Sequence, residues 1–184
     1  MEHFYNNIQG WFDFETLYQI IVQTANDNSH FVEVGAWKGK SAAFLAVEII
    51  NSGKNIKLDL VDTWEGSDEP AHHADEYVQT NTLYSHFLEN MKPVENHYTP
   101  LKMNSLEAAA QYQDNSLDFV FIDAGHTYED CHSDITAWLP KIKPGGYIAG
   151  HDYNTSPNGV RRAVQELLPE HTEAPPNSWI MKKF

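Results

Sequence analysis

The sequence predicts an α/β fold, a three-layer sandwich in which helices cover both faces of a mainly parallel sheet. Short strand-like runs alternate with stretches of helical spacing along the chain, and this alternation is typical of parallel sheets. The run Leu117–Ile122 is hydrophobic enough to be buried on both faces, as central parallel strands are. A glycine turn joins the first strand-like run to a helical stretch, and open α/β sheets bind ligands at such turns.

Each expected element has a local reason. The first helix has apolar side chains every three or four positions and Asp13 as its expected N-cap. Asn51-Ser52-Gly53 ends the second helix, and Pro140 ends a later one. β-Branched and aromatic runs predict the strands. The expected helices cover residues 13–26, 41–50, 75–91, 127–139 and 160–168, and the expected strands cover residues 31–34, 56–61, 117–122, 147–150 and 178–181, with a weaker one near Tyr98.

The length of 184 residues suits a single domain, residues 1–184. It is expected to begin with a helical segment at about 1–28. An insertion at about 65–95 is longer than a crossover between parallel strands needs. Because ligands bind beyond the carboxyl ends of parallel strands, this insertion is placed to act as a lid. Its two histidines, His72 and His73, could contact an acceptor, but the polar loop around them favours a solvated position.

The composition excludes several classes of function. Lys and Arg number 12 against 26 Asp and Glu, so the net charge is −14 with all histidines neutral. This balance disfavours nucleic acids and anionic membranes as partners. The single cysteine, Cys131, excludes an internal disulfide and a cysteine-built zinc site. There is no signal peptide or membrane-length apolar run, so we expect a soluble, cytoplasmic protein.

The glycine turn, residues 33–41, admits three interpretations. It ends like a phosphate-binding P-loop, but Gly35 and Gly39 are one residue too close together. It also resembles a dinucleotide fingerprint, except that Trp37 replaces the middle glycine. The third interpretation is the turn of class I S-adenosylmethionine-dependent methyltransferases, in which an acidic residue, here Glu33, precedes Gly-x-x-x-Gly. That cofactor has no phosphate, so the turn need not form a phosphate cradle.

Asp62 favours the third interpretation. It stands at the carboxyl end of the second strand, where an acidic side chain can accept hydrogen bonds from both ribose hydroxyls of an adenosine. This position fits a ligand without a 2′-phosphate. The structural alternative is a solvated loop carboxylate.

Most of the chain, from about Asn28 onward, resembles small bacterial and viral class I methyltransferases related to catechol-type and sugar O-methyltransferases. Three stretches carry the resemblance: residues 31–35, 116–128 and 143–153. It implies a Rossmann-like, seven-stranded sheet with an antiparallel C-terminal strand around Trp179. It also implies S-adenosylmethionine as cofactor. The implied cofactor-binding residues are Glu33, Gly35, Ala36, Trp37, Gly39, Ser41, Asp62, Thr63, Trp64, Asn104, Ser105 and Asp123.

Four polar residues follow the fourth and fifth strands and are expected to face one crevice. His126 stands three positions after Asp123, where the catechol-type branch has its base, and His151 is the second candidate base. That branch also holds a divalent cation, and the resemblance places it on Asp123, His151 and Asp152. The imidazole ligand suits Zn²⁺ or Mn²⁺ better than Mg²⁺. Whether a metal is required stays open.

The predicted function is transfer of a methyl group from S-adenosylmethionine to a hydroxyl of a small-molecule acceptor, a sugar or a phenolic compound. Two alternatives stay open: a metal-dependent hydrolase that uses the Asp and His cluster, and a non-catalytic cofactor-binding module. An NTPase is the weakest candidate. A homodimer is a further expectation, with the aromatic N-terminal residues Phe4, Tyr5, Trp11 and Phe12 as its contact.

Overall fold

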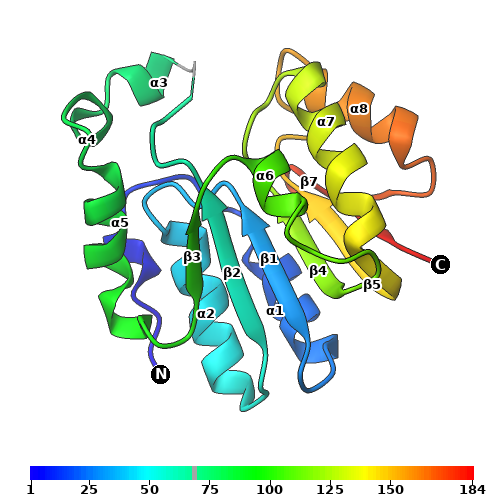
Figure 1. Ribbon diagram of the computed structural model, residues 1–184, viewed down its shortest axis with the longest axis horizontal. Coiled ribbons are helices and arrows are strands. Elements are labelled where there is room, and N and C mark those ends of the chain that lie inside the picture. Colours follow the sequence, from blue (N-terminus) through cyan, green and yellow to red (C-terminus); the bar gives the residue numbers. More distant parts are fainter. Residues whose placement is uncertain (68–69) are drawn as a thin grey trace.

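The computed structural model describes residues 1–67 and 70–184 and contains a seven-stranded sheet of order β3-β2-β1-β4-β5-β7-β6 (Figure 1). Neighbouring strands run parallel from β3 to β5, and β7 runs antiparallel to both of its neighbours. The expected fold class is therefore confirmed. The strands are β1 (His30–Val34), β2 (Lys57–Asp62), β3 (Thr99–Lys102), β4 (Leu117–Ile122), β5 (Ile142–Gly150), β6 (Thr172–Ala174) and β7 (Ser178–Lys182).

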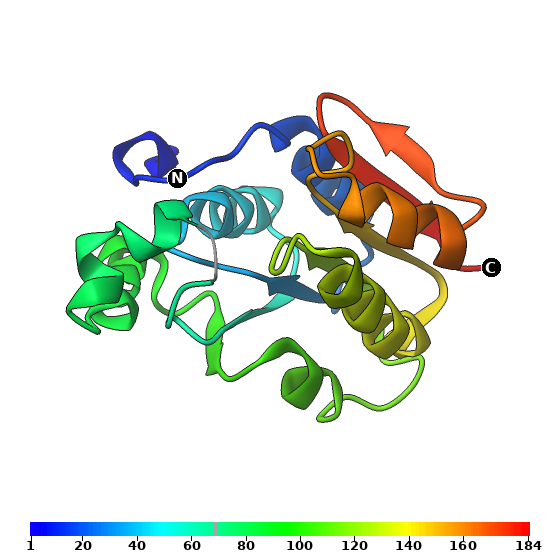
Figure 2. The ribbon, with the colours of Figure 1, turned by 90° about the horizontal axis from the view of Figure 1, so that it is seen from above.

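Helices cover both faces of this sheet, and Figure 2 shows α1 and α2 on one face and α6 and α7 on the other. Side chains alternate along β1, so that Phe31 packs towards α1 and α2 while Val32 and Val34 pack towards α6, α7 and α8. The helices are α1 (Glu15–Thr24), α2 (Lys40–Ser52), α3 (Pro70–His73), α4 (Glu76–Gln79), α5 (Leu83–Met91), α6 (Ser105–Ala109), α7 (Tyr128–Trp138) and α8 (Gly159–Leu167), with 3₁₀ turns at Tyr5–Asn7, Lys92–Val94 and Leu139–Lys141.

The insertion differs most from expectation. The single helix predicted over residues 75–91 is two helices, α4 and α5, preceded by α3. Asn81 separates α4 from α5 in a left-handed conformation with φ of 55°, which ends a helix. Asp68 and Glu69 of the insertion lie outside the described residues.

Two further boundaries differ from expectation, and two short elements are additional. Asp13 does not cap the first helix: the N-cap is Phe14, which makes no side-chain capping bond, and Asp13 pairs with His151 instead. Strand β5 begins at Ile142 rather than Tyr147, with a register shift against β4. The short elements α6 and β6 were not expected.

The N-terminal segment packs against its own chain. Phe4, Tyr5 and Phe12 are partly buried against the core, and the Phe12 ring lies 5.1 Å from that of Phe44 on α2. Of the aromatic residues expected to form a subunit contact, only Trp11 stays largely exposed, at 67%. Within residues 1–67 and 70–184, no helix is both long and apolar enough to cross a membrane.

Candidate active site

A cavity of about 180 Å³ opens at the carboxyl edge of the sheet, where β1, β2 and β4 end. Parallel strands place their carboxyl ends together, so residues far apart in sequence meet there. The insertion contributes one wall and the turn after β3 another. The described residues that line it are Val34, Gly35, Trp37, Val61, Asp62, Thr63, Gly66, Ser67, His72, Met103, Asn104, Ser105, Asp123, Ala124 and Gly125.

The two glycines of the turn after β1 have different tasks. Gly35 has a φ of +97°, and a Cβ there would lie 1.9 Å from the backbone oxygen of Asp123. Glycine is therefore required for β1 and β4 to approach. Gly39 also has a positive φ, of +91°, but its Cβ would meet Met91 of α5 at 2.9 Å. It faces the insertion and does not line the cavity.

Asp62 is held in place by the turn that it faces. Its Oδ2 accepts a hydrogen bond from the backbone amide of Trp37 at 2.8 Å, and its Oδ1 accepts one from that of Trp64 at 2.7 Å. Burial raises the pKa of Asp62, and these two amide bonds oppose the rise. The carboxylate thus has a fixed orientation at the cavity wall, and each oxygen keeps a further lone pair for a ligand.

Glu33 lies beneath the turn, away from the cavity. It is 1% exposed, and its Oε1 accepts a hydrogen bond from Ser41 Oγ at 2.5 Å. Burial raises its pKa to about 8, against the smaller effect of the Ser41 bond. At neutral pH this carboxyl is mostly protonated, so it does not present an anionic group to a sulfonium.

The cavity therefore divides the predicted cofactor-binding residues into two groups. Trp64 belongs to the core: it is 1% exposed, and its indole donates to the backbone oxygen of Trp37 at 2.8 Å. Its side chain cannot stack on a ligand. The predicted residues that line the cavity are Gly35, Trp37, Asp62, Thr63, Asn104, Ser105 and Asp123, whereas Glu33, Ala36, Gly39, Ser41 and Trp64 support it from behind.

Asn104 and Ser105 form the wall after β3. The Asn104 side chain caps α6 by accepting a hydrogen bond from the amide of Glu107 at 2.9 Å. Ser105 Oγ accepts a hydrogen bond from the indole of Trp138 at 2.8 Å. Both residues are thus held by α6 and α7 at the cavity edge.

Three of the four predicted chemical residues converge. His126 Nε2 lies 3.1 Å from Asp152 Oδ2 and 3.6 Å from Asp123 Oδ1. One possible ligand atom from each of these residues lies within 4.8 Å of the others. The amide of Asp123 donates to the backbone oxygen of Val34 at 2.8 Å, which ties the cluster to β1. We call Asp123, His126 and Asp152 the catalytic cluster.

His151 lies beside the catalytic cluster, with its Nδ1 3.9 Å from Asp123 Oδ1. Its Nδ1 lies 3.1 Å from Asp152 Oδ2 and its Nε2 lies 2.9 Å from Asp13 Oδ1. Burial lowers the pKa of His151, but the bond with Asp152 and the charges of Asp123 and Asp152 outweigh it and raise the pKa to about 9. In its charged form His151 supports Asp152 through this bond, and its predicted roles as base and metal ligand stay predictions.

The pKa of Asp152 moves in the opposite direction. Burial raises it, but hydrogen bonds from His151 and Thr155 and the charge of His126 outweigh burial and lower it to about 2. Asp152 is therefore a carboxylate at neutral pH, with the charge needed to orient an imidazole or to bind a cation.

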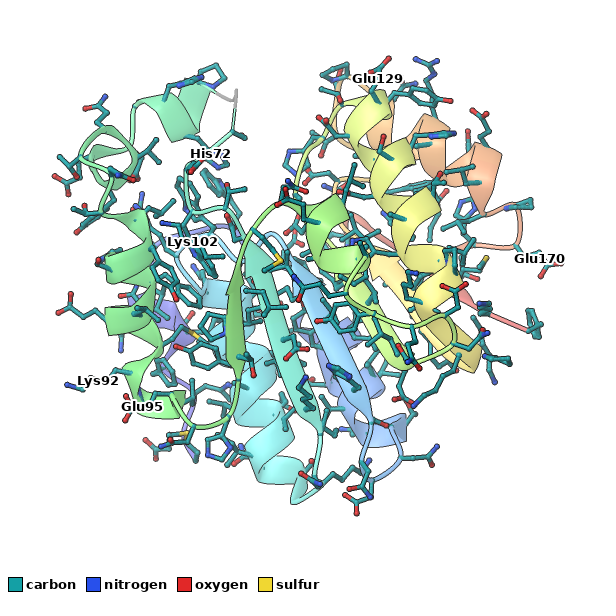
Figure 3. The ribbon with its side chains drawn as sticks, viewed as in Figure 1. His72, Lys92, Glu95, Lys102, Glu129 and Glu170 are labelled. Carbon is teal, nitrogen blue, oxygen red and sulfur yellow. The ribbon has the colours of Figure 1, made fainter. Side chains whose placement is uncertain are left out.

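Sequence reasoning missed two site residues. His72, expected to be solvated, lines the cavity and stacks on Trp37, with ring centroids 4.0 Å apart. Figure 3 shows it on the insertion side of the opening. Asp13, expected to be a helix cap, pairs with His151. Asp13 does not begin a regular capping box, and this was the only signal in the sequence against its role as a helix cap.

Comparisons with known proteins agree with this geometry. A sequence model of the methyltransferase domain family matches residues 32–153. The uncharacterized protein y4gI of Sinorhizobium fredii (strain NBRC 101917 / NGR234) is 23% identical over 128 residues. These residues are 70% of this chain and 13% of that protein, so the chain spans a small part of that relative.

Solved structures share the fold. The O-methyltransferase NovP superposes with a TM-score of 0.71 at 16% identity, covering 92% of this chain and 78% of NovP. The Streptococcus mutans protein SMU.1697c, solved in complex with SAH, superposes with a TM-score of 0.60 at 14% identity, covering 96% of this chain and 100% of that one. The family match spans the glycine turn, Asp62 and the catalytic cluster, and this chain belongs to the class I S-adenosylmethionine-dependent methyltransferases.

Proposed function

We propose that the protein methylates a hydroxyl group of a small acceptor, a sugar or a phenolic compound, with help from a divalent cation. The observation that carries the proposal is the catalytic cluster, in which a histidine and two carboxylates meet beside the cavity. Oxygen methylation needs removal of the acceptor proton, and a histidine held by carboxylates is suited to that task.

The lining of the cavity fits the cofactor. Asp62 would accept hydrogen bonds from the ribose hydroxyls, because its carboxylate is fixed by the amides of Trp37 and Trp64 and faces the cavity. Asn104 and Ser105 would flank the adenine. When bound, S-adenosylmethionine supplies an electrophilic methyl group on a sulfonium. Asp123 lines the cavity and also belongs to the catalytic cluster. It would therefore link the methyl donor to the cluster.

His126 would act as the base. Its Nε2 lies 3.1 Å from Asp152 Oδ2, and this carboxylate would stabilise the imidazolium that forms when the acceptor proton is taken. His151, paired with both Asp152 and Asp13, would keep the carboxylate in place. Asp123 would orient the acceptor hydroxyl.

A divalent cation would bind to the catalytic cluster. His126 would then be its imidazole ligand, in place of the His151 that the sequence predicts. One imidazole and two carboxylates suit Mn²⁺ or Zn²⁺ better than Mg²⁺. Such a cation would lower the pKa of a bound hydroxyl. His126 cannot be a metal ligand and the base at the same time through one nitrogen. Whether the reaction depends on a metal distinguishes these two roles.

Three measurements test the proposal. Calorimetry should show binding of S-adenosylhomocysteine that Asp62→Ala weakens. His126→Ala should lower kcat for methyl transfer by about 10²–10⁴-fold with cofactor affinity unchanged, while His97→Ala, which removes an exposed histidine on a distant turn, should have no effect. Chelation followed by Mn²⁺ addition should lower and restore the rate if the cation is needed.

Each competing function predicts a different result. A hydrolase would turn over its substrate without S-adenosylmethionine and would tolerate Asp62→Ala. A non-catalytic module would bind the cofactor normally, and His126→Ala would change nothing measurable. Failure to bind S-adenosylhomocysteine would refute the proposal.

A further inference from the structure

Resting on the proposed function, we infer that the acceptor is a neutral glycosyl ring that stacks on the exposed indole of Trp11 at the rim of the cavity, with its hydroxyls towards Asp13 and the catalytic cluster. The inference narrows the acceptor from two chemical classes to one. It also assigns the N-terminal segment, residues 8–14, to the acceptor site.

An aromatic rim leads from the cavity to Trp11. Trp37 lines the cavity, and His72 stacks on it at 4.0 Å with an interplanar angle of 18°. The Trp11 ring lies 6.1 Å from His72 at 49°. Ser67 Oγ lies 2.7 Å from His72 Nδ1, which fixes the middle ring of the three. Trp11 is thus the outermost member of a continuous aromatic surface.

Trp11 is exposed although the residues on either side of it are held in place. It is 67% exposed, whereas Phe14 is 2% exposed. Phe12 next to it packs edge-on against Phe14 with centroids 4.7 Å apart. On the other side, Lys40 Nζ donates to the backbone oxygen of Gly10 at 3.1 Å. Because both neighbours are held, the indole presents a positioned apolar face to solvent, a feature typical of binding sites.

Hydrogen-bond acceptors lie close to this indole. Asp13 is two residues from Trp11, and two residues of extended chain span at most about 7 Å. Its Oδ1 faces His151 at 2.9 Å, while its side chain remains 49% exposed. Asp152, the other partner of His151, belongs to the catalytic cluster. A ring on Trp11 would therefore have carboxylates along the edge that faces the methyl donor. Figure 2 shows the N-terminal segment running past α2 towards α1.

The charge and shape of the site favour a neutral sugar over the other acceptors. None of the described residues that line the cavity is lysine or arginine, so a phosphorylated or carboxylated acceptor that reaches the catalytic cluster would meet its two carboxylates without an ammonium or guanidinium group of the lining to offset them. A sugar ring has hydroxyls around its edge and C–H groups on its face, which match carboxylates and an indole. A small phenol would need an enclosed slot for alignment, and the Trp11 indole is open to solvent.

Tryptophan fluorescence of the complex with S-adenosylhomocysteine tests the inference directly. Of five tryptophans, Trp64, Trp138 and Trp179 are buried, so a ring on Trp11 should change the emission. The probes are neutral methyl glycosides, namely methyl glucoside, methyl galactoside and methyl rhamnoside, with catechol and glucose 6-phosphate for comparison. We expect at least one glycoside to change the emission, and Trp11→Phe to remove that change.

Rates of methyl transfer supply the second readout. Trp11→Ala should lower kcat/KM for the glycoside about tenfold, mainly through KM, because stacking and apolar burial are lost. Ile20→Ala removes another exposed apolar side chain, at 53%, and should leave the rate unchanged. Equal kcat/KM for Trp11→Ala and the parent protein, or transfer to catechol with no transfer to any glycoside, would overturn the inference while the proposed function stands. Loss of cofactor binding in the parent protein would instead refute the proposed function.

Discussion

Gly35 shows at the scale of one residue how the fold and the cofactor turn depend on each other. A Cβ at this position would lie 1.9 Å from the backbone oxygen of Asp123, so alanine would force β1 and β4 apart. Gly53 also has a left-handed φ, of +69°, but a Cβ there would meet nothing within 4 Å. Gly53→Ala should cost about 1 kcal/mol. Gly35→Ala should cost more than about 3 kcal/mol.

Chemical denaturation of the two variants measures this difference, since both positions have a positive φ and only Gly35 also carries the collision. Calorimetry with S-adenosylhomocysteine should show that Gly53→Ala binds normally and Gly35→Ala does not. Equal stability of the two variants would mean that the close approach at Gly35 is not needed.

Glu33 predicts a pH dependence of stability. Burial raises its pKa to about 8 in the folded protein, whereas an unfolded glutamate has a pKa of about 4.3. The folded state therefore holds a proton that the unfolded state releases between these values. This contribution to stability is complete below the lower pKa and is lost as pH rises towards 8, by up to about 1.4 kcal/mol per pH unit.

Glu33→Gln should remove that dependence, because the amide imitates the protonated carboxyl and does not titrate. Denaturation of both proteins from pH 5 to pH 8 should show the variant gaining stability relative to the parent as pH rises. A constant difference across this range would show that Glu33 has the same pKa in both states.

At the scale of elements, Lys38 joins the cofactor turn to the insertion and the N-terminal segment. It is 0% exposed, and its Nζ donates to Gln9 and to Asp75 Oδ2, the latter at 2.5 Å. The ammonium also lies 4.8 Å from the ring centre of Tyr77, and Asn90 donates to its backbone oxygen at 2.9 Å. The N-terminal segment and the insertion thus meet at one buried cation.

Lys38→Met should therefore cost about 3–5 kcal/mol, because it leaves Asp75 without its cation in a partly buried site. Lys57→Met offers the contrast: its side chain is 58% exposed in its pair with Asp59, so its loss should cost less than about 1 kcal/mol. The double variant with Asp75→Asn should recover part of the loss. Thermal unfolding measures all of these, and a Lys38→Met protein as stable as the parent would contradict the prediction.

The elements also show what sequence patterns can and cannot predict. Strand β4 has the predicted bounds because its apolar run is continuous and bounded by polar residues. Helix α6 has only five residues, too few for periodicity to show. Asp13 looked like a cap because capping is local, but its partner is His151, 138 residues away.

The site residues likewise divide into those that the sequence could predict and those that it could not. Topology brings the carboxyl ends of β4 and β5 together, so Asp123 and Asp152 were predictable neighbours of His126. The stack of His72 on Trp37 was not, because the insertion has no periodic pattern that would fix its path over the turn. The placement of Trp64 in the core depends on the same path, since it packs on Tyr84 and Phe87 of α5.

Charge is the property that belongs to the whole molecule, and it bears on the acceptor. The net charge is −14, and several cations are occupied internally. Lys54 donates to the backbone oxygens of Val22, Gln23 and Ala25 at 2.8, 2.7 and 2.8 Å. The Lys38 ammonium is buried. Few positive groups remain to release counterions from a polyanion, so RNA and DNA should bind poorly.

We therefore predict that a labelled RNA hairpin binds more weakly than about 100 µM at physiological salt, the weak limit of non-specific binding. The basic pair Arg161-Arg162 does not alter this, because two guanidinium groups can neutralise only about two phosphates. Both groups also stack on tyrosines, at 4.8 Å and 4.6 Å from the ring centres of Tyr153 and Tyr128. Fluorescence anisotropy measures the affinity, and binding of S-adenosylhomocysteine by the same sample shows that the protein is active. Salt-dependent binding below about 1 µM would contradict a small-molecule acceptor and would direct the search towards nucleic acid, because counterion release gives that salt dependence.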